Sequence, residues 1–89
     1  MATMFGRHQV TDFANWKQAY DDFNPRRSEL GVTAQAVYRA ADNPNDVTVT
    51  HEFAAIEAAQ RFASSDDLRG AMGKAGVVGE PTIWFANRS

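Results

Sequence analysis

The chain has 89 residues, of which nine are basic, eleven are acidic and none is cysteine, and its net charge is −2. This length predicts one domain, residues 1–89, and the lack of cysteine excludes disulfides and thiolate metal sites. Arg26-Arg27 is the only basic doublet, which argues against nucleic-acid binding. No apolar run reaches the ~20 residues of a membrane span. The first ten residues lack the apolar segment of a secretory signal, so we expect a cytoplasmic protein.

The first half of the chain predicts a strand followed by a broken helix. Residues 2–10 read as a strand, after which Thr11 or Asp12 is suited to cap a helix. The helix carries an inward aromatic stripe at spacings of three and four residues. The residues of this stripe are Phe13, Trp16, Tyr20 and Phe23. Pro25 interrupts the helix and permits a restart, with Asn24 as its cap and Gly31 after its end. The sequence therefore predicts a kinked or two-part helix over about residues 12–30.

The second half predicts a hairpin, a further pair of helices and a last strand. Residues 32–40 form the second strand, and the turn-rich stretch 41–46 leads into the third strand, "DVTVTHEF" (46–53). Helical periodicity begins after Ala54, is renewed by a cap at Ser64 or Ser65, and ends at Gly76. "VVGEP" reads as a turn before the final strand, 82–87.

This order of elements predicts an α+β fold of the ferredoxin-like split βαββαβ type. Its four-stranded antiparallel sheet has helices on one face only. In the third strand Val47, Val49 and Phe53 alternate with three polar residues, so the apolar side belongs under the helices. The polar side, with Trp84 of the last strand, then falls on the uncovered face.

The uncovered face predicts pairing of two chains. An exposed Trp84, with Tyr38 and Met4 or Phe5, would form a large apolar patch on a single subunit. Two such sheets packed face to face remove the patch and enclose a barrel between the subunits. Its lumen would be apolar with a few convergent polar groups, as small-molecule sites are. Either Arg7 or His8 of the first strand would line it.

Three stretches carry a resemblance to a known family. "GRHQVTDFANWKQAY", "DNPNDVTVTHEF" and "SSDDLRGAMGKAGVVGEP" resemble small bacterial proteins of the dimeric α+β barrel family, the cyclase-like or antibiotic-biosynthesis-monooxygenase-like proteins. The resemblance runs over essentially the whole chain, although Pro25 departs from the usual uninterrupted first helix. It implies the fold and a homodimer, whereas its members range from cofactor-free oxygenases to polyketide cyclases and haem-degrading enzymes. No catalytic set carries over. The residues that match are His8, Val10, Asp12, Trp16, Glu52, Phe53, Leu68, Gly76 and Val77.

Glu52 and His8 are the catalytic candidates. A carboxylate enclosed in an apolar lumen has a raised pKa and can take a proton from an acidic carbon or a phenol. The alternative for Glu52 is a salt bridge to Arg7, Arg39 or an arginine of a second subunit. His8 is suited to proton transfer near neutral pH, and its alternative is a structural histidine at a strand end. His51 shares a face with Val49 and Phe53, so we interpret it as a core histidine.

Trp84 and Tyr38 are the candidates for holding an aromatic ligand, together with Thr48, Thr50 and Arg7. Both rings offer flat apolar surface with an N–H or O–H group, and plain interface packing is the alternative. Two histidines are too few for a structural zinc site without the help of carboxylates, so we expect no metal. We expect no cofactor either. Asp66 and Asp67 read as a helix start and not as a catalytic pair of carboxylates, since adjacent helical residues point apart.

These features predict a homodimer that binds a small aromatic or polyketide-like molecule. As an enzyme of secondary or aromatic metabolism it would catalyse cyclisation or cofactor-independent monooxygenation. A non-catalytic metabolite-binding or haem-binding dimer is the alternative, and so is a filled barrel without any ligand.

Overall fold

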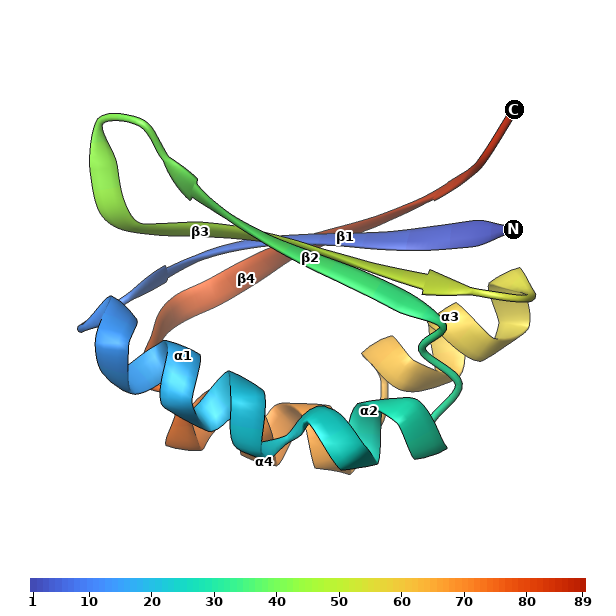
Figure 1. Cartoon of the computed structure of the whole chain (residues 1–89), viewed down its shortest axis with the longest axis horizontal. Coiled ribbons are helices and arrows are strands. Elements are labelled where there is room, and N and C mark those ends of the chain that lie inside the picture. The colour runs from blue at the N-terminus through green and yellow to red at the C-terminus, as the bar shows by residue number, and fades with distance from the viewer.

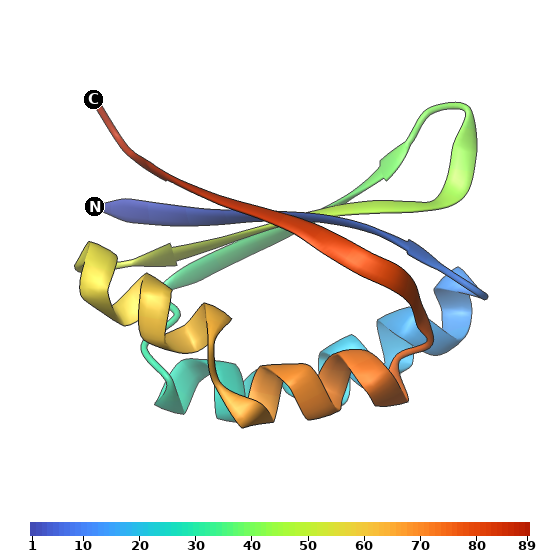
Figure 2. The ribbon, with the colours of Figure 1, turned by 180° about the vertical axis from the view of Figure 1, so that it is seen from behind.

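The computed structural model describes all residues, Met1–Ser89, and has eight helices and strands. Their bounds are β1 (Ala2–Val10), α1 (Phe13–Asp22), α2 (Asn24–Glu29), β2 (Ala34–Ala40), β3 (Asn43–Phe53), α3 (Ile56–Ala63), α4 (Asp66–Lys74) and β4 (Val77–Asn87). The four strands form one antiparallel sheet in the order β2-β3-β1-β4. All helices lie on one side of it, and the other side is bare (Figures 1 and 2). The predicted ferredoxin-like architecture is confirmed.

The break in the first helical segment follows from proline, as the sequence predicts. Asp12 caps α1, its carboxylate accepting from the backbone N–H of Ala14 at 3.1 Å. Pro25 lies in the first turn of α2, where the missing N–H costs no hydrogen bond. The predicted cap is wrong, however, because Phe23 occupies that position and contributes no side-chain bond. The amide oxygen of Asn24 instead accepts from Nε2 of Gln35 at 2.8 Å, which ties α2 to β2.

Two strands extend further than the sequence predicts. β3 begins at Asn43, because only Ala41 and Asp42 are needed to turn the chain and Ala40 already pairs with Asn43. β4 begins at Val77 and includes the predicted "VVGEP" turn. Gly79 has φ of +71°, and the pairing of β4 with β1 shifts its register between Arg7 and Gln9. A bulge therefore replaces the turn.

The core lies between the sheet and the helices, where two apolar clusters form. One contains Met4, Phe53, Ala59, Phe62 and Leu68, and the other contains Val10, Trp16, Val47, Val49 and Ala75. The expected inward side of β3 is thus correct, and so is that of β4, whose Ile83 and Phe85 pack against the first cluster.

The uncovered face carries an aromatic pair on β1 and the edge strand β4. Phe5 and Trp84 are paired neighbours on β1 and β4, and their rings stack with centroids 5.4 Å apart. Trp84 is 43% exposed and Tyr38 is 59% exposed. On β1 the bare face receives Arg7 rather than His8, and the Arg7 guanidinium pairs there with Asp46. No helix of the chain combines the length and apolar character that a membrane span requires.

Gly76 follows the end of α4 and lies against Thr11, just before α1. We expect Gly76→Ala to destabilise the fold. Its φ is +78°, and an added Cβ would lie 2.8 Å from Oγ1 of Thr11. Left-handed backbone costs a residue with a Cβ roughly 1–2 kcal/mol, and the contact adds to this. Urea unfolding should therefore show a loss of about 2 kcal/mol.

Gly73→Ala is the matched control for this prediction. Gly73 lies in α4 with nothing within 4 Å of an added Cβ. Alanine there should raise the free energy of unfolding by roughly 0.5–1 kcal/mol, since it is the better helix former. Equal effects of the two substitutions would contradict the role given to Gly76.

Candidate functional site

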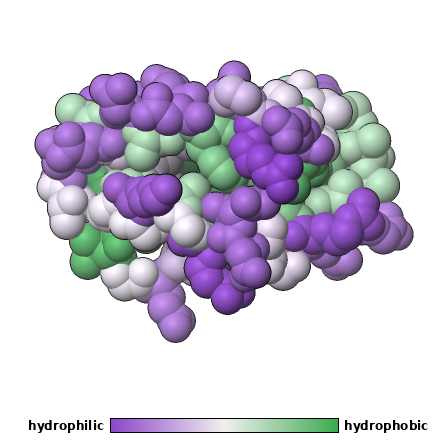
Figure 3. Space-filling model, turned by 90° about the horizontal axis from the view of Figure 1, so that it is seen from below, coloured by the Kyte–Doolittle hydropathy of each residue, from purple (hydrophilic) through white to green (hydrophobic).

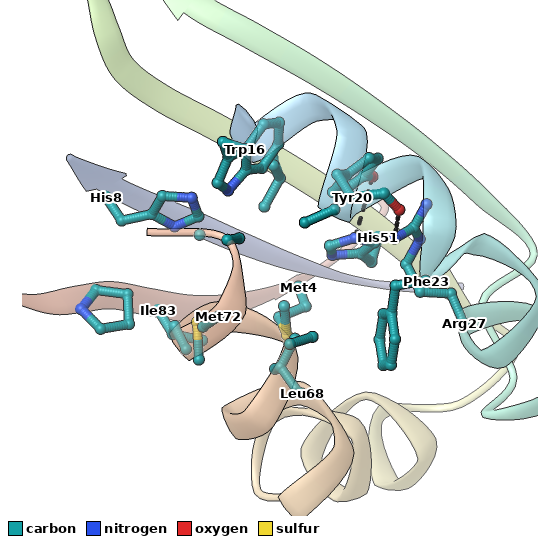
Figure 4. Close-up of a pocket in the computed structure, with 16 residues that line it drawn as sticks. Met4, His8, Trp16, Tyr20, Phe23, Arg27, His51, Leu68, Met72 and Ile83 are labelled. Atoms are coloured by element: carbon teal, nitrogen blue, oxygen red, sulfur yellow. Dashed lines mark hydrogen bonds between the residues drawn. The ribbon is translucent and has the colours of Figure 1, made fainter. Parts of the chain in front are cut away.

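A small, mostly apolar cavity lies between the sheet and helices α1, α2 and α4. Its volume is about 50 Å³. A protein cavity that holds one benzene has roughly 150 Å³, so the lining must move apart before a ring system can enter. The lining residues are Met4, Gly6, His8, Trp16, Ala19, Tyr20, Phe23, Arg27, Val49, His51, Leu68, Ala71, Met72, Ala75, Pro81 and Ile83 (Figure 4).

His8 supplies the polar group at one end of this cavity. It projects from β1 under the helices, is 9% exposed, and its Nε2 has no hydrogen-bond partner. Its ring lies 5.6 Å from that of Trp16, centroid to centroid. Burial lowers the pKa of His8, and the negative charge of Asp46 acts in the opposite direction. His8 is therefore neutral at pH 7, with a negative charge nearby should it take up a proton.

His51 and Tyr20 supply polar groups at the other end. The Tyr20 hydroxyl and Nε2 of His51 share a hydrogen bond of 3.3 Å, while Nδ1 of His51 has no partner. His51 is 3% exposed. Its pKa falls to about 4, because burial and the positive charge of Arg27 both disfavour the imidazolium. His51 is thus a neutral hydrogen-bonding group with one free nitrogen.

Aromatic rings join the two histidines along one wall of the cavity. Trp16 stacks on Tyr20 with centroids 4.8 Å apart, and Tyr20 lies 6.1 Å from His51. The strand register gives the length of the site, because His51 pairs with Met4, four positions before His8 on β1. At about 3.3 Å per residue the two histidine backbones are separated by roughly 13 Å along the sheet. Figure 4 shows them on opposite sides of the cavity. The site suits a flat, elongated molecule with a polar group at each end.

A groove between α1 and α4 adjoins the cavity. It has a volume of about 560 Å³ and shares Ala19, Phe23 and Ala71 with the cavity wall. Asp22, Asp66, Asp67 and Lys74 line its outer part. The underside of the molecule, where the helices lie, shows hydrophobic residues between hydrophilic ones (Figure 3). Phe23, Ala19 and Ala71 therefore lie between the groove and the cavity.

The structure separates the predicted site residues into two groups. His8 alone lines the cavity. The others fall on the bare face of the sheet, opposite the cavity: Arg7, Tyr38, Thr48, Thr50, Glu52 and Trp84. Glu52 makes no ion pair within the chain, and Arg7 pairs with Asp46 instead. A site on that face needs a second subunit to enclose it, and the roles of these residues remain predictions.

Sequence reasoning missed Tyr20, Arg27 and His51 as site residues. The sequence pattern places Tyr20 in the inward aromatic stripe and His51 in the core. His51 is buried as expected, but one of its nitrogens is unpartnered. A signal for Arg27 does exist, because it is spaced by four and three residues from the inward Phe23 and Leu30. No group of three or more His, Asp or Glu side chains is placed to hold a metal.

Comparison with solved structures identifies the fold. No protein-family model and no curated protein sequence matches the chain. A protein from Bordetella bronchiseptica assigned to the antibiotic biosynthesis monooxygenases is similar with a TM-score of 0.85 at 13% identity, over 99% of this chain and 96% of its own. Another, from Caulobacter crescentus, gives 0.78 at 15% identity, over 99% and 89%.

A third similar structure has an activity in its description. SnoaB from Streptomyces nogalater, a cofactor-independent oxygenase, matches with a TM-score of 0.75 at 14% identity, over 99% of this chain and 94% of its own. At these identities the likeness concerns the backbone arrangement and not the residues of a site. The chain therefore has the ferredoxin-like fold of the antibiotic biosynthesis monooxygenases.

Proposed function

We propose that the protein binds a small aromatic molecule in the cavity under its helices and oxygenates it without a cofactor. One observation carries the proposal: two neutral imidazoles with unpartnered nitrogens, His8 Nε2 and His51 Nδ1, line a mostly apolar cavity. A buried polar group without a partner costs about 1–3 kcal/mol, so such groups call for an explanation. Hydrogen bonds between these two nitrogens and a bound ligand would explain why both lack a partner in the protein. The fold shared with a cofactor-independent oxygenase supports the same reading.

The geometry suits a reaction that begins with removal of a proton. His8, neutral at pH 7, takes a proton from an acidic C–H or phenol of the ligand, and the resulting anion is electron-rich enough to react with O₂. For a methylene between two rings, a C–O bond forms, and the hydroperoxide loses water to leave a ketone. The balance is R₂CH₂ + O₂ → R₂C=O + H₂O. Trp16 and Tyr20 hold the ring, and His51 hydrogen-bonds a ligand oxygen at the far end.

Turnover of anthrone, whose methylene between two rings is acidic, tests the proposal. Oxygen uptake should match formation of the quinone one to one in the metal-free protein. We expect His8→Gln to lower kcat by about 10²–10⁴-fold, the usual contribution of a general base, while the ligand still binds. Because burial lowers the pKa of His8, the acid limb of the kcat/KM profile should lie below pH 6.5. Binding without any oxygen uptake would contradict the enzymatic function.

Glu52→Gln decides between the cavity and the bare face as the place of reaction. Loss of turnover in His8→Gln alone assigns the chemistry to the cavity. Loss in Glu52→Gln alone assigns it to a lumen between two subunits, as the sequence predicts.

We further propose that two chains pair through the bare faces of their sheets. Exposed Trp84 and Tyr38, with the Phe5–Trp84 stack between β1 and β4, are apolar surface that a partner would remove from water. The pairing requires no rearrangement of the cavity, which lies on the opposite side of the sheet.

A further inference from the structure

Arg27 is a charged side chain buried at the wall of the cavity. It lies in α2, is 2% exposed, and is among the largest fully buried side chains of the protein. Its guanidinium carbon lies 3.7 Å from the centre of the Tyr20 ring and 5.8 Å from that of Phe23. Figure 4 places it at the end of the cavity formed by Tyr20 and His51. The cation therefore lies where a ligand would meet His51.

No carboxylate of the protein forms an ion pair or a hydrogen bond with this guanidinium, and the charge of Asp21 acts on it only from a greater distance. Nε of Arg27 donates to Oε1 of Gln35 at 2.7 Å, Nη1 to the Tyr20 carbonyl at 2.5 Å, and Nη2 to Oδ1 of Asn24 at 3.4 Å. All three acceptors are neutral, and two of the five N–H groups of the guanidinium have no protein acceptor.

The ion-paired arginines of the chain differ from Arg27 in this respect. Arg7, Arg26 and Arg69 are far more exposed, and each forms an ion pair with an aspartate. A buried cation without a counter-charge costs several kcal/mol, whereas an exposed one does not. Arg27 is thus the most deeply buried arginine, and no carboxylate lies within ion-pair distance of it.

We propose that the ligand brings the missing negative charge: the cavity binds an aromatic carboxylic acid, with its carboxylate at Arg27 and His51. This inference rests on the proposed function and narrows its substrate class. A carboxylate matches the planar N–H pattern of a guanidinium better than a neutral carbonyl does. The acid group would lie at the end remote from His8, so the reacting C–H or phenol and the carboxylate belong at opposite ends of a fused-ring molecule.

A purely structural role for Arg27 is the competing explanation. Its hydrogen bonds connect the end of α1, α2 and β2, and its substitution would weaken that junction whatever the ligand. A structural arginine, however, gives no preference between a charged ligand and a neutral one of the same shape. Selectivity for charge is therefore the deciding measurement.

The experiment compares 2-naphthoate with 2-naphthamide, which have nearly the same shape and differ in charge. Binding at pH 7 is followed by NMR through the resonances of Trp16 and His51. We expect the wild type to bind naphthoate at least about tenfold more tightly, the gain expected of a charge-assisted hydrogen bond. Arg27→Gln should remove this preference. Arg26→Gln is the matched control, since the neighbouring Arg26 is exposed and pairs with Asp67, and it should retain the preference.

A second measurement needs no variant, in case Arg27→Gln does not fold. Naphthoate beside His51 should raise the pKa of that histidine from about 4, and naphthamide should leave it there. Equal affinities for the two probes, with shifts at Trp16 and His51, would overturn the inference and leave the cavity as the ligand site. Failure of both probes to shift these resonances would overturn the inference together with the cavity site.

Discussion

Acidification from pH 7 to pH 4 is expected to cost the fold about 3 kcal/mol through His51 alone. The unfolded chain takes up a proton at this histidine near pH 6.5, whereas the folded chain does so only near its pKa of about 4. Between these values the unfolded state binds more protons, so stability falls as the pH falls. The loss is about 2 kcal/mol by pH 5 and levels off below pH 4. A domain of this size has little stability in reserve.

His51→Gln is the variant that isolates this effect. Glutamine keeps a hydrogen-bonding group near the Tyr20 hydroxyl but does not titrate. The substitution loses ring contacts with Phe62 and Tyr20, so it lowers stability at pH 7 as well. The informative quantity is the change in the free energy of unfolding between pH 7 and pH 5, measured with urea and tryptophan fluorescence. That change should be about 2 kcal/mol smaller in the variant than in the wild type.

The lowered pKa of His51 can also be checked directly in the wild type. Direct NMR titration should find His51 neutral throughout the range where an ordinary histidine becomes charged. Parallel pH dependences for the two proteins, or titration of His51 near pH 6.5, would contradict the burial and the influence of Arg27 described for it. Carboxylates such as Asp46 contribute to acid sensitivity in both proteins equally, and they cancel in the comparison.

The local patterns of the sequence predict the fold well because each has a short-range physical cause. Asp12 and Ser65 cap helices through their own side chains, and Pro25 breaks one through its ring. Alternation along β3 places Val47, Val49 and Phe53 inward. Apart from the cap of α2, the errors are at strand ends: Gly79 reads as a turn residue, but its left-handed conformation forms a bulge within β4. Pairing with β1, a contact distant in sequence, decides that outcome.

The site was harder to predict because it depends on packing across the sheet. The sequence divides residues between two faces but does not show that the helices leave a cavity on theirs. The polar pattern of the bare face favours Glu52, Thr48 and Thr50 as site residues, whereas the pattern of Tyr20 and His51 is typical of core residues. That His51 has one unpartnered nitrogen, and that Arg27 has no carboxylate, emerge only when the neighbours are known.

Trp84→Glu is expected to weaken the proposed homodimer by about a thousandfold or more. A central interfacial tryptophan is typically worth at least about 2 kcal/mol, and a two-fold symmetric interface contains it twice, which gives about 4 kcal/mol. The added carboxylates lie on the same bare face and repel each other as well. Sedimentation of the wild type should show two subunits at micromolar concentration, and the variant should sediment as a folded single subunit. Gln60→Glu adds the same charge on the exposed side of α3, and it should remain dimeric.

Trp84→Glu also tests whether the cavity binds its ligand independently of the bare face. Because the cavity lies under the helices, a monomeric Trp84→Glu should still bind naphthoate, provided that the sheet keeps its shape without a partner. If the wild type itself sediments as one subunit, the bare face encloses nothing. The roles predicted for Glu52, Tyr38, Thr48, Thr50 and Arg7 then fail, while those of His8, His51 and Arg27 are untouched. Binding lost on dissociation would instead mean that the partner holds the cavity in its working form.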